Sequence, residues 1–421
     1  MSGPARPLGR PDEPLEPVRG VRVVLDARPL QEPDKAPATA AYLDGLLSAF
    51  DAAPLEGESF ALFLQSDLDD PTSRFERLSV VGRRMLPPTR LLRSAALTVD
   101  PFLLRGAALG AAWRADRAGA AGAVYHAAGG GALPLALGLP VVVTLLDLAP
   151  WEMPGAFQRT PATRLGQRIR GRLLHDADAL IVGTEAVREA ARRLLRVRRD
   201  RVRVIPFAPR DAFTPDGPDG AEERGRLGLP ERYLVYAGRY DARQDLATLL
   251  RALAGLAADG RPVALPDAVP WPPRILLVGA SPDDRAALAR AAAREGVGDA
   301  LAYAPRLPDA RLAALVRGAR AAILPVLSEA AGFAAIDAIA AGTPVVASAV
   351  GALPELVGAA GILVPPREPE RLATALHTAW ADERVHARIA GEARSRAARR
   401  RTWADVADAT RRVYAEVGAF D

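Results

Sequence analysis

Two acidic residues, Glu329 and Asp337, stand eight positions apart in the last third of the chain. The apolar run at 321–324 predicts a buried parallel strand, and the apolar stretch after Gly332 predicts a helix. This order places Glu329 before the start of the helix and Asp337 inside it. The start of a helix has free backbone N–H groups and is therefore an anion-binding site. The two carboxylates are thus placed to bind hydroxyl groups on either side of a bound phosphate.

The elements that must position this pair belong to an α/β architecture. Apolar runs typical of buried strands alternate with segments typical of helices, which indicates parallel sheets with crossover helices. The alternation stops in a stretch rich in Pro, Gly and Asp at 207–230 and then restarts. Ligands of such sheets bind at the carboxyl ends of the strands, so we predict a cleft between two successive α/β domains. The predicted parts are a disordered tail (1–20), an amino-terminal domain (21–208) and a carboxyl-terminal domain (209–402).

Individual elements are predicted within these domains. The first strand is expected at 21–25. Thr184, followed directly by an acidic residue, is a typical N-cap for the helix that comes after it. The predicted helices used below span 39–50, 160–174, 184–195 and 403–417.

Composition limits the possible classes of function. The 421 residues are 49% hydrophobic, which suffices for two cores, and they contain no long uninterrupted apolar run. The absence of cysteine excludes disulfides and thiolate metal sites, and the four histidines are scattered, so no metal site is predicted. The first twenty residues lack the apolar core of a secretory signal. We therefore predict a cytoplasmic protein, with contact at the inner face of the membrane as an alternative.

The net charge of +5 comes almost entirely from arginine, because Lys35 is the only lysine. Nucleic-acid binding is not predicted, since only 5% of the residues are aromatic and stacking platforms for bases are scarce. The basic, apolar segments 83–117 and 164–172 suit an anionic membrane surface. They equally suit amphipathic helices that pack on a sheet, and the sequence leaves both readings open.

The segment around the two acids resembles a known family. The segment consists of Glu329, seven residues, Asp337 and then Ala-Ile-Ala-Ala-Gly-Thr-Pro-Val-Val at 338–346. It resembles a motif of the retaining GT-B glycosyltransferases of family 4, also called glycosyl transferases group 1. That family has two glutamates separated by seven residues, followed by Ala-x-Ala-x-Gly-Thr-Pro-Val-Val. The resemblance extends over 21–417, and it implies that a terminal helix at 403–421 crosses back onto the first domain.

The resemblance implies a GT-B fold, an α/β architecture of two Rossmann-like, doubly wound parallel-sheet domains that face each other across a cleft. It also implies an enzyme that moves a sugar from a nucleotide-diphosphate sugar to an acceptor with retention of anomeric configuration. The acceptor is a glycan, a lipid-linked group or a small molecule, and no cofactor is expected beside the sugar nucleotide. Glu329 and Arg239 would be the catalytic residues, with Glu329 on hydroxyls of the sugar and Arg239 on the diphosphate. The remaining predicted contacts are Asp337 with the ribose, the N–H groups of Gly332, Phe333 and Ala334 with the diphosphate, and Gln244 at the position of a second basic contact.

The chemistry needs no metal. Breaking a sugar–phosphate bond leaves negative charge on the departing diphosphate, and an arginine with helix-start amides can stabilise that charge. The departing phosphate can itself accept the proton of the acceptor on the same face of the sugar.

The chain departs from the family at four places. Ala-Pro-Ala-Thr-Ala-Ala-Tyr at 36–42 stands where the family has a glycine-rich turn, and Leu146 stands where it has histidine. Gln244 replaces the usual lysine, and Asp337 is one methylene shorter than glutamate. The neighbouring Arg243 is predicted to point elsewhere if the turn after the strand is preserved. These losses leave a second hypothesis open, a catalytically impaired protein that serves as a nucleotide-sugar-binding or partner subunit.

Two further residues are candidates for the acceptor side of the cleft. Asp147 follows a β-branched strand, and His126 ends another strand of the amino-terminal half. A histidine at a strand end is also a common structural residue, so both roles of His126 stay open.

Overall fold

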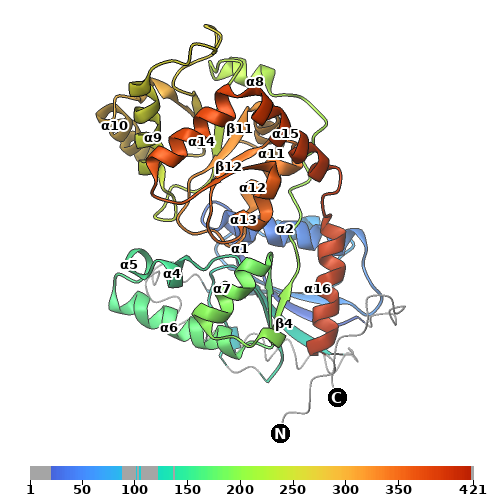
Figure 1. Ribbon diagram of the computed structural model, residues 1–421. Coiled ribbons are helices and arrows are strands. Elements are labelled where there is room, and N and C mark those ends of the chain that lie inside the picture. Colours follow the sequence, from blue (N-terminus) through green and yellow to red (C-terminus); the bar gives the residue numbers. More distant parts are fainter. Residues whose placement is uncertain (1–19, 88–100, 102–103, 106–121, 136–137, 419–421) are drawn as a thin grey trace.

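The computed structural model describes residues 20–87, 101, 104–105, 122–135 and 138–418. The chain forms two α/β domains stacked on each other, each built on one parallel sheet (Figure 1). The predicted tail and much of the basic segment 83–117 lie outside the described residues.

In the part of the first domain that the structure describes, seven strands form one sheet in the order β3-β2-β1-β4-β5-β6-β7. Its strands are β1 (Arg22–Asp26), β2 (Ser59–Gln65), β3 (Val80–Leu86), β4 (Ala123–Ala128), β5 (Val141–Thr144), β6 (Ala179–Val182) and β7 (Val202–Val204). Its helices are α1 (Arg28–Gln31), α2 (Pro37–Ala52), α4 (Ala149–Glu152), α5 (Pro154–Phe157), α6 (Pro161–Asp176) and α7 (Glu185–Leu195).

The second domain carries a six-stranded sheet in the order β10-β9-β8-β11-β12-β13. Its strands are β8 (Leu234–Ala237), β9 (Ile275–Val278), β10 (Leu301–Ala304), β11 (Ala321–Leu324), β12 (Val345–Ser348) and β13 (Gly361–Val364). Its helices are α8 (Ala221–Arg226), α9 (Leu246–Asp259), α10 (Pro282–Arg294), α11 (Asp309–Gly318), α12 (Phe333–Ala340), α13 (Leu353–Val357), α14 (Pro369–Ala381) and α15 (Glu383–Ala397). Short 3-10 turns complete both domains.

Both sheets are doubly wound, as predicted. In each sheet, the strands that follow the first one are added at one side of it, and the later strands are added at its other side. The strand order therefore reverses beside β1 in one sheet and beside β8 in the other. The reversal leaves β1 paired with β4, and β8 paired with β11. Loops diverge at such a switch point, and ligands bind there, outside the carboxyl ends of the strands.

Most strands of each sheet are buried on both faces, which explains their nearly continuous apolar character, whereas the edge strand β3 is largely exposed. Val23 and Leu25 of β1 pack with α2 on one face, whereas Val24 between them packs on the other. The second sheet divides in the same way between the side of α11 and α12 and the side of α9 and α14. Burial of these alternating side chains fixes the register of the strands.

The predicted helices that have caps agree closely with the structure. Thr184 is the N-cap of α7, and its side chain accepts a hydrogen bond from the Val187 N–H. Thr160 is the N-cap of α6, and its side chain accepts a hydrogen bond from the Thr163 N–H. The helix predicted at 39–50 is longer, because α2 starts at Pro37, a residue that suits the first helical turn.

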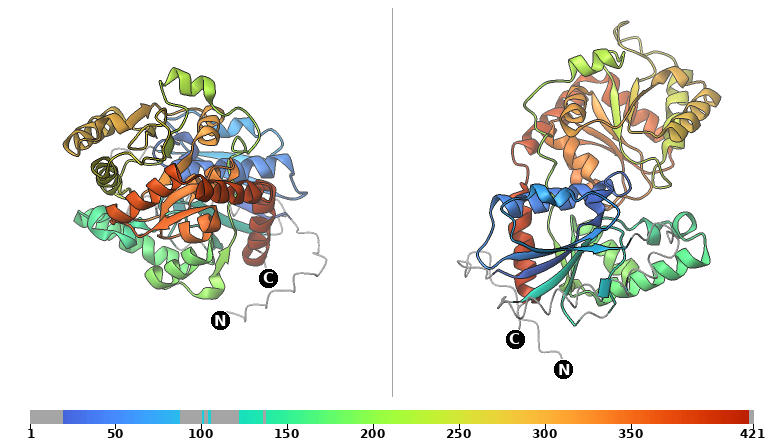
Figure 2. Two further views of the ribbon diagram at one scale, coloured as in Figure 1. Left: turned by 45° about the horizontal axis from the view of Figure 1, so that its top comes forward. Right: turned by 180° about the vertical axis from the view of Figure 1, so that it is seen from behind.

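The last helix, α16 (Trp403–Gly418), crosses back from the second domain and packs against α2 and β4 of the first (Figure 2). Its Val406, Val413 and Tyr414 enter the core beside β1. At the crossing point, the Trp403 indole N–H donates to the Pro209 carbonyl at 2.9 Å. The chain therefore passes between the domains twice at this side of the molecule.

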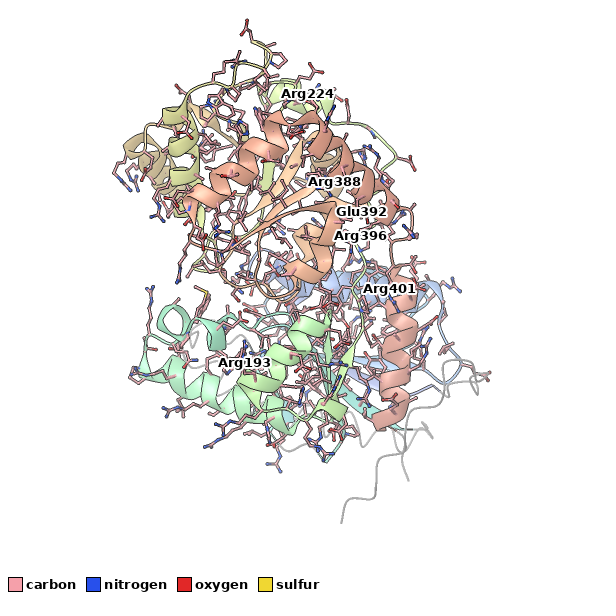
Figure 3. All side chains as sticks on the ribbon, viewed as in Figure 1. Arg193, Arg224, Arg388, Glu392, Arg396 and Arg401 are labelled. Carbon is pink, nitrogen blue, oxygen red and sulfur yellow. The ribbon has the colours of Figure 1, made fainter. Side chains whose placement is uncertain are left out.

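Arginines lie on helices of both domains, and Figure 3 labels Arg193 on α7 together with Arg388 and Arg396 on α15. On α6, which holds the basic segment 164–172, Arg170 is buried and donates to the Gly129 carbonyl at 2.6 Å. One side of this segment thus packs on the domain. Among the helices of the described residues, none has both the length and the apolar character needed to cross a membrane.

Candidate active site

The segment from β11 to α12 forms the centre of the candidate site. The chain leaves β11, turns at the residues around Glu329 and enters α12 through Gly332, the N-cap. Gly332 has a φ of +71°, and a Cβ atom there would lie 2.1 Å from Leu356 Cδ1. Only glycine suits this backbone and this space. The predicted order, acid before the helix and acid within it, is what the structure has.

Glu329 lies at the start of α12 and is half-buried. Its Oε1 accepts hydrogen bonds from the N–H groups of Gly332 at 2.8 Å and Ala331 at 3.1 Å. Burial raises the pKa of the Glu329 carboxyl, and the charge of Asp147 adds to the rise, whereas the Gly332 N–H and Arg243 lower it. The Gly332 N–H, which was predicted to bind the diphosphate, therefore donates to the Glu329 carboxylate instead. The other two N–H groups predicted to bind the diphosphate, those of Phe333 and Ala334, lie in the first turn of the helix.

Arg239 follows β8, the strand that neighbours β11, so it lies at the same switch point as Glu329. Its Nε donates to Asp241 Oδ2 at 2.8 Å, and the side chain stays about one-third exposed. Its Nη2 also reaches the Lys35 carbonyl of the first domain at 3.4 Å. Lys35 belongs to the loop between α1 and α2, beside the position at which the family has a glycine-rich turn and this chain does not. This loop approaches Arg239 from across the domain boundary.

Arg243 does not point away from the site, contrary to the prediction. Its Nη1 donates to Asp147 Oδ2 of the first domain at 2.7 Å, and its Nη2 donates to Asp241 Oδ2 at 2.7 Å. The turn after β8 directs the side chain across the boundary, where the guanidinium lies 5.2 Å from the centre of the Phe157 ring. Asp147, an acceptor-side candidate, is thus an interdomain ion-pair partner.

Gln244 has two structural roles. Its side-chain Oε1 accepts from the Tyr236 hydroxyl at 2.8 Å, and its backbone forms an isolated antiparallel bridge with Val326. The structure therefore directs the side chain toward Tyr236, which is buried beneath the turn. Leu146 is buried in the core of the first domain and presents no polar group.

Asp337 is buried within α12 and forms an ion pair with Arg210. Arg210 lies in the linker between the domains and was not among the residues predicted from the sequence. The Asp337 carboxylate accepts from the Arg210 backbone N–H at 2.9 Å and from its Nε at 2.9 Å. Burial raises the pKa of the Asp337 carboxyl, and Arg210 acts in the opposite direction. The cavity left beside them measures about 20 Å³, room for about one water molecule. No periodic pattern or motif marks Arg210, so its partner was not predictable from sequence.

The two domains are in close contact around this site. Phe333 of α12 stacks on Phe207 with ring centres 5.6 Å apart, and it packs with the core of the first domain. Glu355 of α13 accepts from the backbone N–H groups of Glu185 and Ala186 at the start of α7, at 3.3 and 3.2 Å. Figure 1 shows α12 and α13 facing the first domain at this boundary.

His126, the second acceptor-side candidate, lies in the core and not at the cleft. Its Nδ1 is 2.6 Å from the Tyr414 hydroxyl and its Nε2 is 2.9 Å from Thr144 Oγ1, so both ring nitrogens have partners. The ring is fully buried. Burial lowers the pKa of His126 to about 3. This geometry fits the structural role that the sequence left open.

The low pKa of His126 predicts loss of stability in acid. Because the folded protein keeps this histidine neutral and the unfolded chain protonates it near pH 6.5, stability falls as the pH drops from 6.5 toward 3. Between pH 7.5 and 5 the group should contribute a loss of about 2 kcal/mol. Urea unfolding of the wild type and of His126→Gln at the two pH values measures the difference.

The exposed His175 on α6 provides the control for this experiment. His175→Gln should keep the wild-type pH dependence, whereas His126→Gln should flatten it. An equal slope in all three proteins would contradict the assignment of the pH effect to His126.

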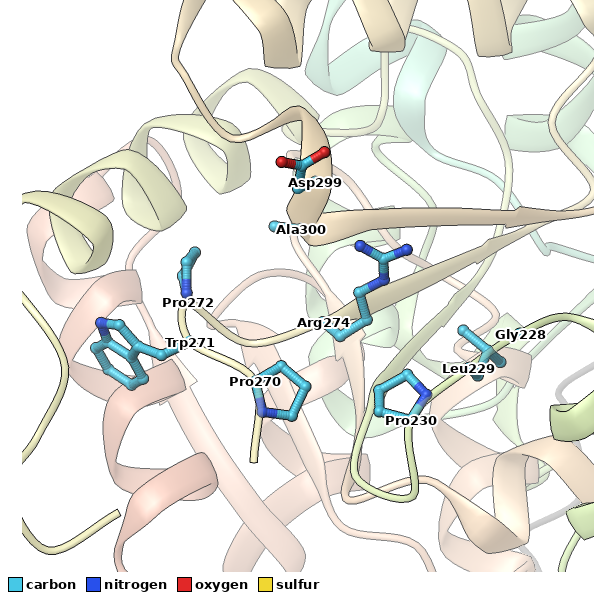
Figure 4. A pocket seen from close by; sticks show the side chains of 9 residues that line it. All are labelled: Gly228, Leu229, Pro230, Pro270, Trp271, Pro272, Arg274, Asp299 and Ala300. Atoms are coloured by element: carbon cyan, nitrogen blue, oxygen red, sulfur yellow. The ribbon is translucent and has the colours of Figure 1, made fainter. Parts of the chain in front are cut away.

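A pocket of about 390 Å³ opens elsewhere, at the amino ends of β8, β9 and β10 (Figure 4). It is lined by Gly228, Leu229, Pro230, Pro270, Trp271, Pro272, Arg274, Asp299 and Ala300. It lies at the opposite ends of the strands from Arg239 and Glu329, so it is separate from the candidate site. Within the described residues, no group of three or more His, Asp or Glu side chains is arranged to hold a metal ion.

Two family models match the chain. Residues 231–382 match the model described as glycosyl transferases group 1, and residues 57–208 match the glycosyl transferase 4-like domain. The two matches fall on the two domains and together cover most of the chain. The first match contains Arg239, Gln244, Glu329 and Asp337.

Curated relatives match over part of their length. The chain is 36% identical over 248 residues to D-inositol 3-phosphate glycosyltransferase of Streptomyces avermitilis, covering 56% of this chain and 52% of the relative. It is 33% identical over 274 residues to the protein of the same name from Stackebrandtia nassauensis, covering 62% of this chain and 58% of the relative. The chain thus spans somewhat more than half the length of these relatives.

Solved structures share the fold over nearly their whole length. Sucrose-phosphate synthase from Thermosynechococcus elongatus superposes with a TM-score of 0.67 at 22% identity, covering 94% of this chain and 98% of that one. Anabaena Alr3699/HepE in complex with UDP superposes with a TM-score of 0.66 at 18% identity, covering 93% and 99%. At these identities the likeness concerns the two-domain arrangement.

Proposed function

The chain belongs to the GT-B glycosyltransferases of group 1, family 4, and from this we propose that it transfers a sugar from a nucleotide-diphosphate sugar to an acceptor hydroxyl, with retention and without a metal ion. The observation that carries the proposal is the meeting of Arg239, Glu329 and the start of α12 at the switch point of the second sheet. These groups come from neighbouring strands, β8 and β11.

The proposed roles of Arg239, the start of α12 and Glu329 follow from the charge that develops during the reaction. When the bond between the anomeric carbon and the phosphate oxygen breaks, negative charge grows on the departing nucleoside diphosphate. The Arg239 guanidinium and the first N–H groups of α12 are suited to stabilise that charge. Glu329, fixed by two N–H groups, directs its remaining carboxylate oxygen lone pairs to sugar hydroxyls. The acceptor oxygen bonds to the anomeric carbon on the face that the phosphate leaves, and its proton passes to a phosphate oxygen.

Asp337 can bind a ribose only after a rearrangement. Its carboxylate is covered by Arg210, and the adjoining cavity is too small for a sugar ring. Binding of the nucleotide must therefore move the Arg210 side chain, which lies on the linker and is about 29% exposed. The moved guanidinium keeps its exposed partner Asp309, whereas the Asp337 carboxylate is only 3% exposed and must accept ribose hydroxyls in place of its cation.

A panel of nucleotide sugars tests the proposal. The similarity to a structure solved with UDP and glucose places UDP-glucose first, followed by UDP-N-acetylglucosamine, GDP-mannose and ADP-glucose. With glycan, inositol phosphate and lipid-linked acceptors present, we expect release of nucleoside diphosphate for at least one sugar nucleotide, unchanged by EDTA. The product should keep the anomeric configuration, which NMR coupling constants report.

The outcomes separate the alternatives. Binding of a nucleoside diphosphate without turnover of any sugar nucleotide would favour the impaired binding or partner subunit. Loss of activity in EDTA that added Mg²⁺ restores would contradict metal independence, and an inverted product would contradict retention.

A further inference from the structure

Arg243 is held by two carboxylates at the boundary between the domains. Its Nη1 donates to Asp147 Oδ2 at 2.7 Å, and its Nε and Nη2 donate to the oxygens of Asp241 at 3.1 and 2.7 Å. Its side chain is only 16% exposed. Although burial lowers the pKa of this guanidinium, the hydrogen bonds with Asp241 and the charge of Asp147 raise it above its ordinary value. Arg243 is therefore a fixed positive charge that faces the first domain.

Several charged groups surround Arg243. Asp241 binds Arg239 as well as Arg243, and Glu329 interacts electrostatically with Arg243 and Asp147. Asp147 also interacts electrostatically with Arg170 of the first domain. As long as Asp147 remains in place, an incoming diphosphate would meet the negative charge of this carboxylate at Arg243. Withdrawal of Asp147 would remove this negative charge from Arg243.

Gln244, the residue predicted to make the second contact with the diphosphate, is bound to Tyr236 instead. The cation available beside it is Arg243. A guanidinium binds carboxylates and phosphates through the same N–H groups. A phosphate oxygen can therefore take the place of the Asp147 oxygen that accepts from Arg243.

We propose that Arg243 is the second cation that binds the diphosphate of the sugar nucleotide, and that Asp147 occupies this position across the cleft until the nucleotide displaces it. This inference rests on the proposed function. Asp147 is then a competitor of the substrate and not a ligand for it. The two partners of one ion pair consequently have opposite effects on nucleotide affinity.

Isothermal titration calorimetry with UDP, ADP and GDP tests the inference, using whichever of the three the wild type binds. Arg243→Gln should weaken binding tenfold or more, because it removes a charge-assisted contact. Asp147→Asn should tighten binding by threefold or more, because it removes the competing charge. Asparagine keeps the Oδ1 that accepts from the Ala149 N–H at 2.9 Å, so the start of α4 is preserved.

The control is Arg232→Gln. Arg232 precedes β8 and is paired with Glu383 at 3.0 Å, so it is an ion-paired arginine at the end of this strand opposite to the end that leads to Arg243. Its loss should leave affinity unchanged. Thermal unfolding of each variant checks that the fold is retained, and Arg243→Lys, which keeps the charge, should recover part of the affinity.

Failure of this inference and failure of the proposed function give different experimental results. If the wild type binds a nucleoside diphosphate and both Arg243→Gln and Asp147→Asn weaken binding or leave it unchanged, Arg243 and Asp147 form a purely structural bridge and this inference is wrong while the proposed function stands. If the wild type binds none of the three nucleotides, the proposed function fails and this inference fails with it.

Discussion

Arg239→Ala is expected to lower kcat/KM for sugar transfer by roughly 100- to 1000-fold, the loss typical of removing one group that stabilises developing charge. Arg239 follows β8 at the switch point, and its guanidinium keeps about one-third of its surface exposed toward the boundary between the domains. Its partner within the domain, Asp241, is shared with Arg243. The substitution thus removes a charge without leaving Asp241 unpaired.

The loss should fall mainly on kcat. Negative charge on the departing diphosphate increases as the bond to the sugar breaks, so an arginine beside it interacts more strongly with the transition state than with the bound substrate. An effect on KM alone would indicate that Arg239 binds the substrate and the transition state equally. Initial rates over a range of sugar-nucleotide concentrations, measured with the substrate found in the panel, separate the two.

A matched arginine controls for the change in total charge. Arg388 lies exposed on α15, away from the boundary, and Arg388→Ala should retain wild-type activity (Figure 3). Arg239→Lys keeps the charge but loses the planar fork, and intermediate activity is expected. Activity of Arg239→Ala within about threefold of the wild type would remove Arg239 from the proposed mechanism.

Features that depend on local sequence were predictable. Apart from the exposed edge strand β3, most strands are buried on both faces, so they are apolar runs that can be recognised without knowledge of their neighbours. Thr184 predicted the start of α7 because an N-cap bonds within its own turn. The order of Glu329, Gly332 and Asp337 likewise lies within one strand–turn–helix unit. The fold class followed from the alternation of such units.

Contacts made when the domains meet were not predictable. Arg210 reaches Asp337, 127 positions away, and Arg243 reaches Asp147, 96 positions away. Each pair depends on how the linker and the two sheets are placed, which no spacing encodes. The position of His126 was similarly undecided, because its partner Tyr414 is 288 positions distant and arrives only when α16 crosses back.

Arg411→Met is expected to destabilise the protein by about 3–5 kcal/mol, the cost of breaking a buried ion pair by removing one partner. Arg411 of α16 donates through Nε and Nη2 to the two carboxylate oxygens of Glu58, at 2.9 and 2.8 Å. Both side chains are only 5% exposed. The guanidinium also donates to the Ala53 carbonyl at 2.7 Å and lies 4.8 Å from the centre of the Phe50 ring. Methionine fills part of this space but leaves the Glu58 carboxylate buried without its cation.

Urea unfolding, followed by circular dichroism, measures the effect, and α16 itself offers a control. Arg203 of β7 pairs with Glu416, five residues beyond Arg411, but these side chains are 28% and 35% exposed. Because water screens this second pair, Glu416→Gln should cost at most about 1 kcal/mol. The contrast separates the effect of burial from the effect of attaching α16 by an ion pair.

The double variant Arg411→Met, Glu58→Leu tests the physical reason. If the cost of Arg411→Met is the desolvation of an unpaired Glu58 carboxylate, replacing that carboxylate with an apolar side chain should recover most of the lost stability. If the double variant is instead less stable than Arg411→Met by the full cost of a second independent change, then the ion pair is not the origin of the effect. In that case the Ala53 hydrogen bond and the packing on Phe50 are what hold α16 to the first domain.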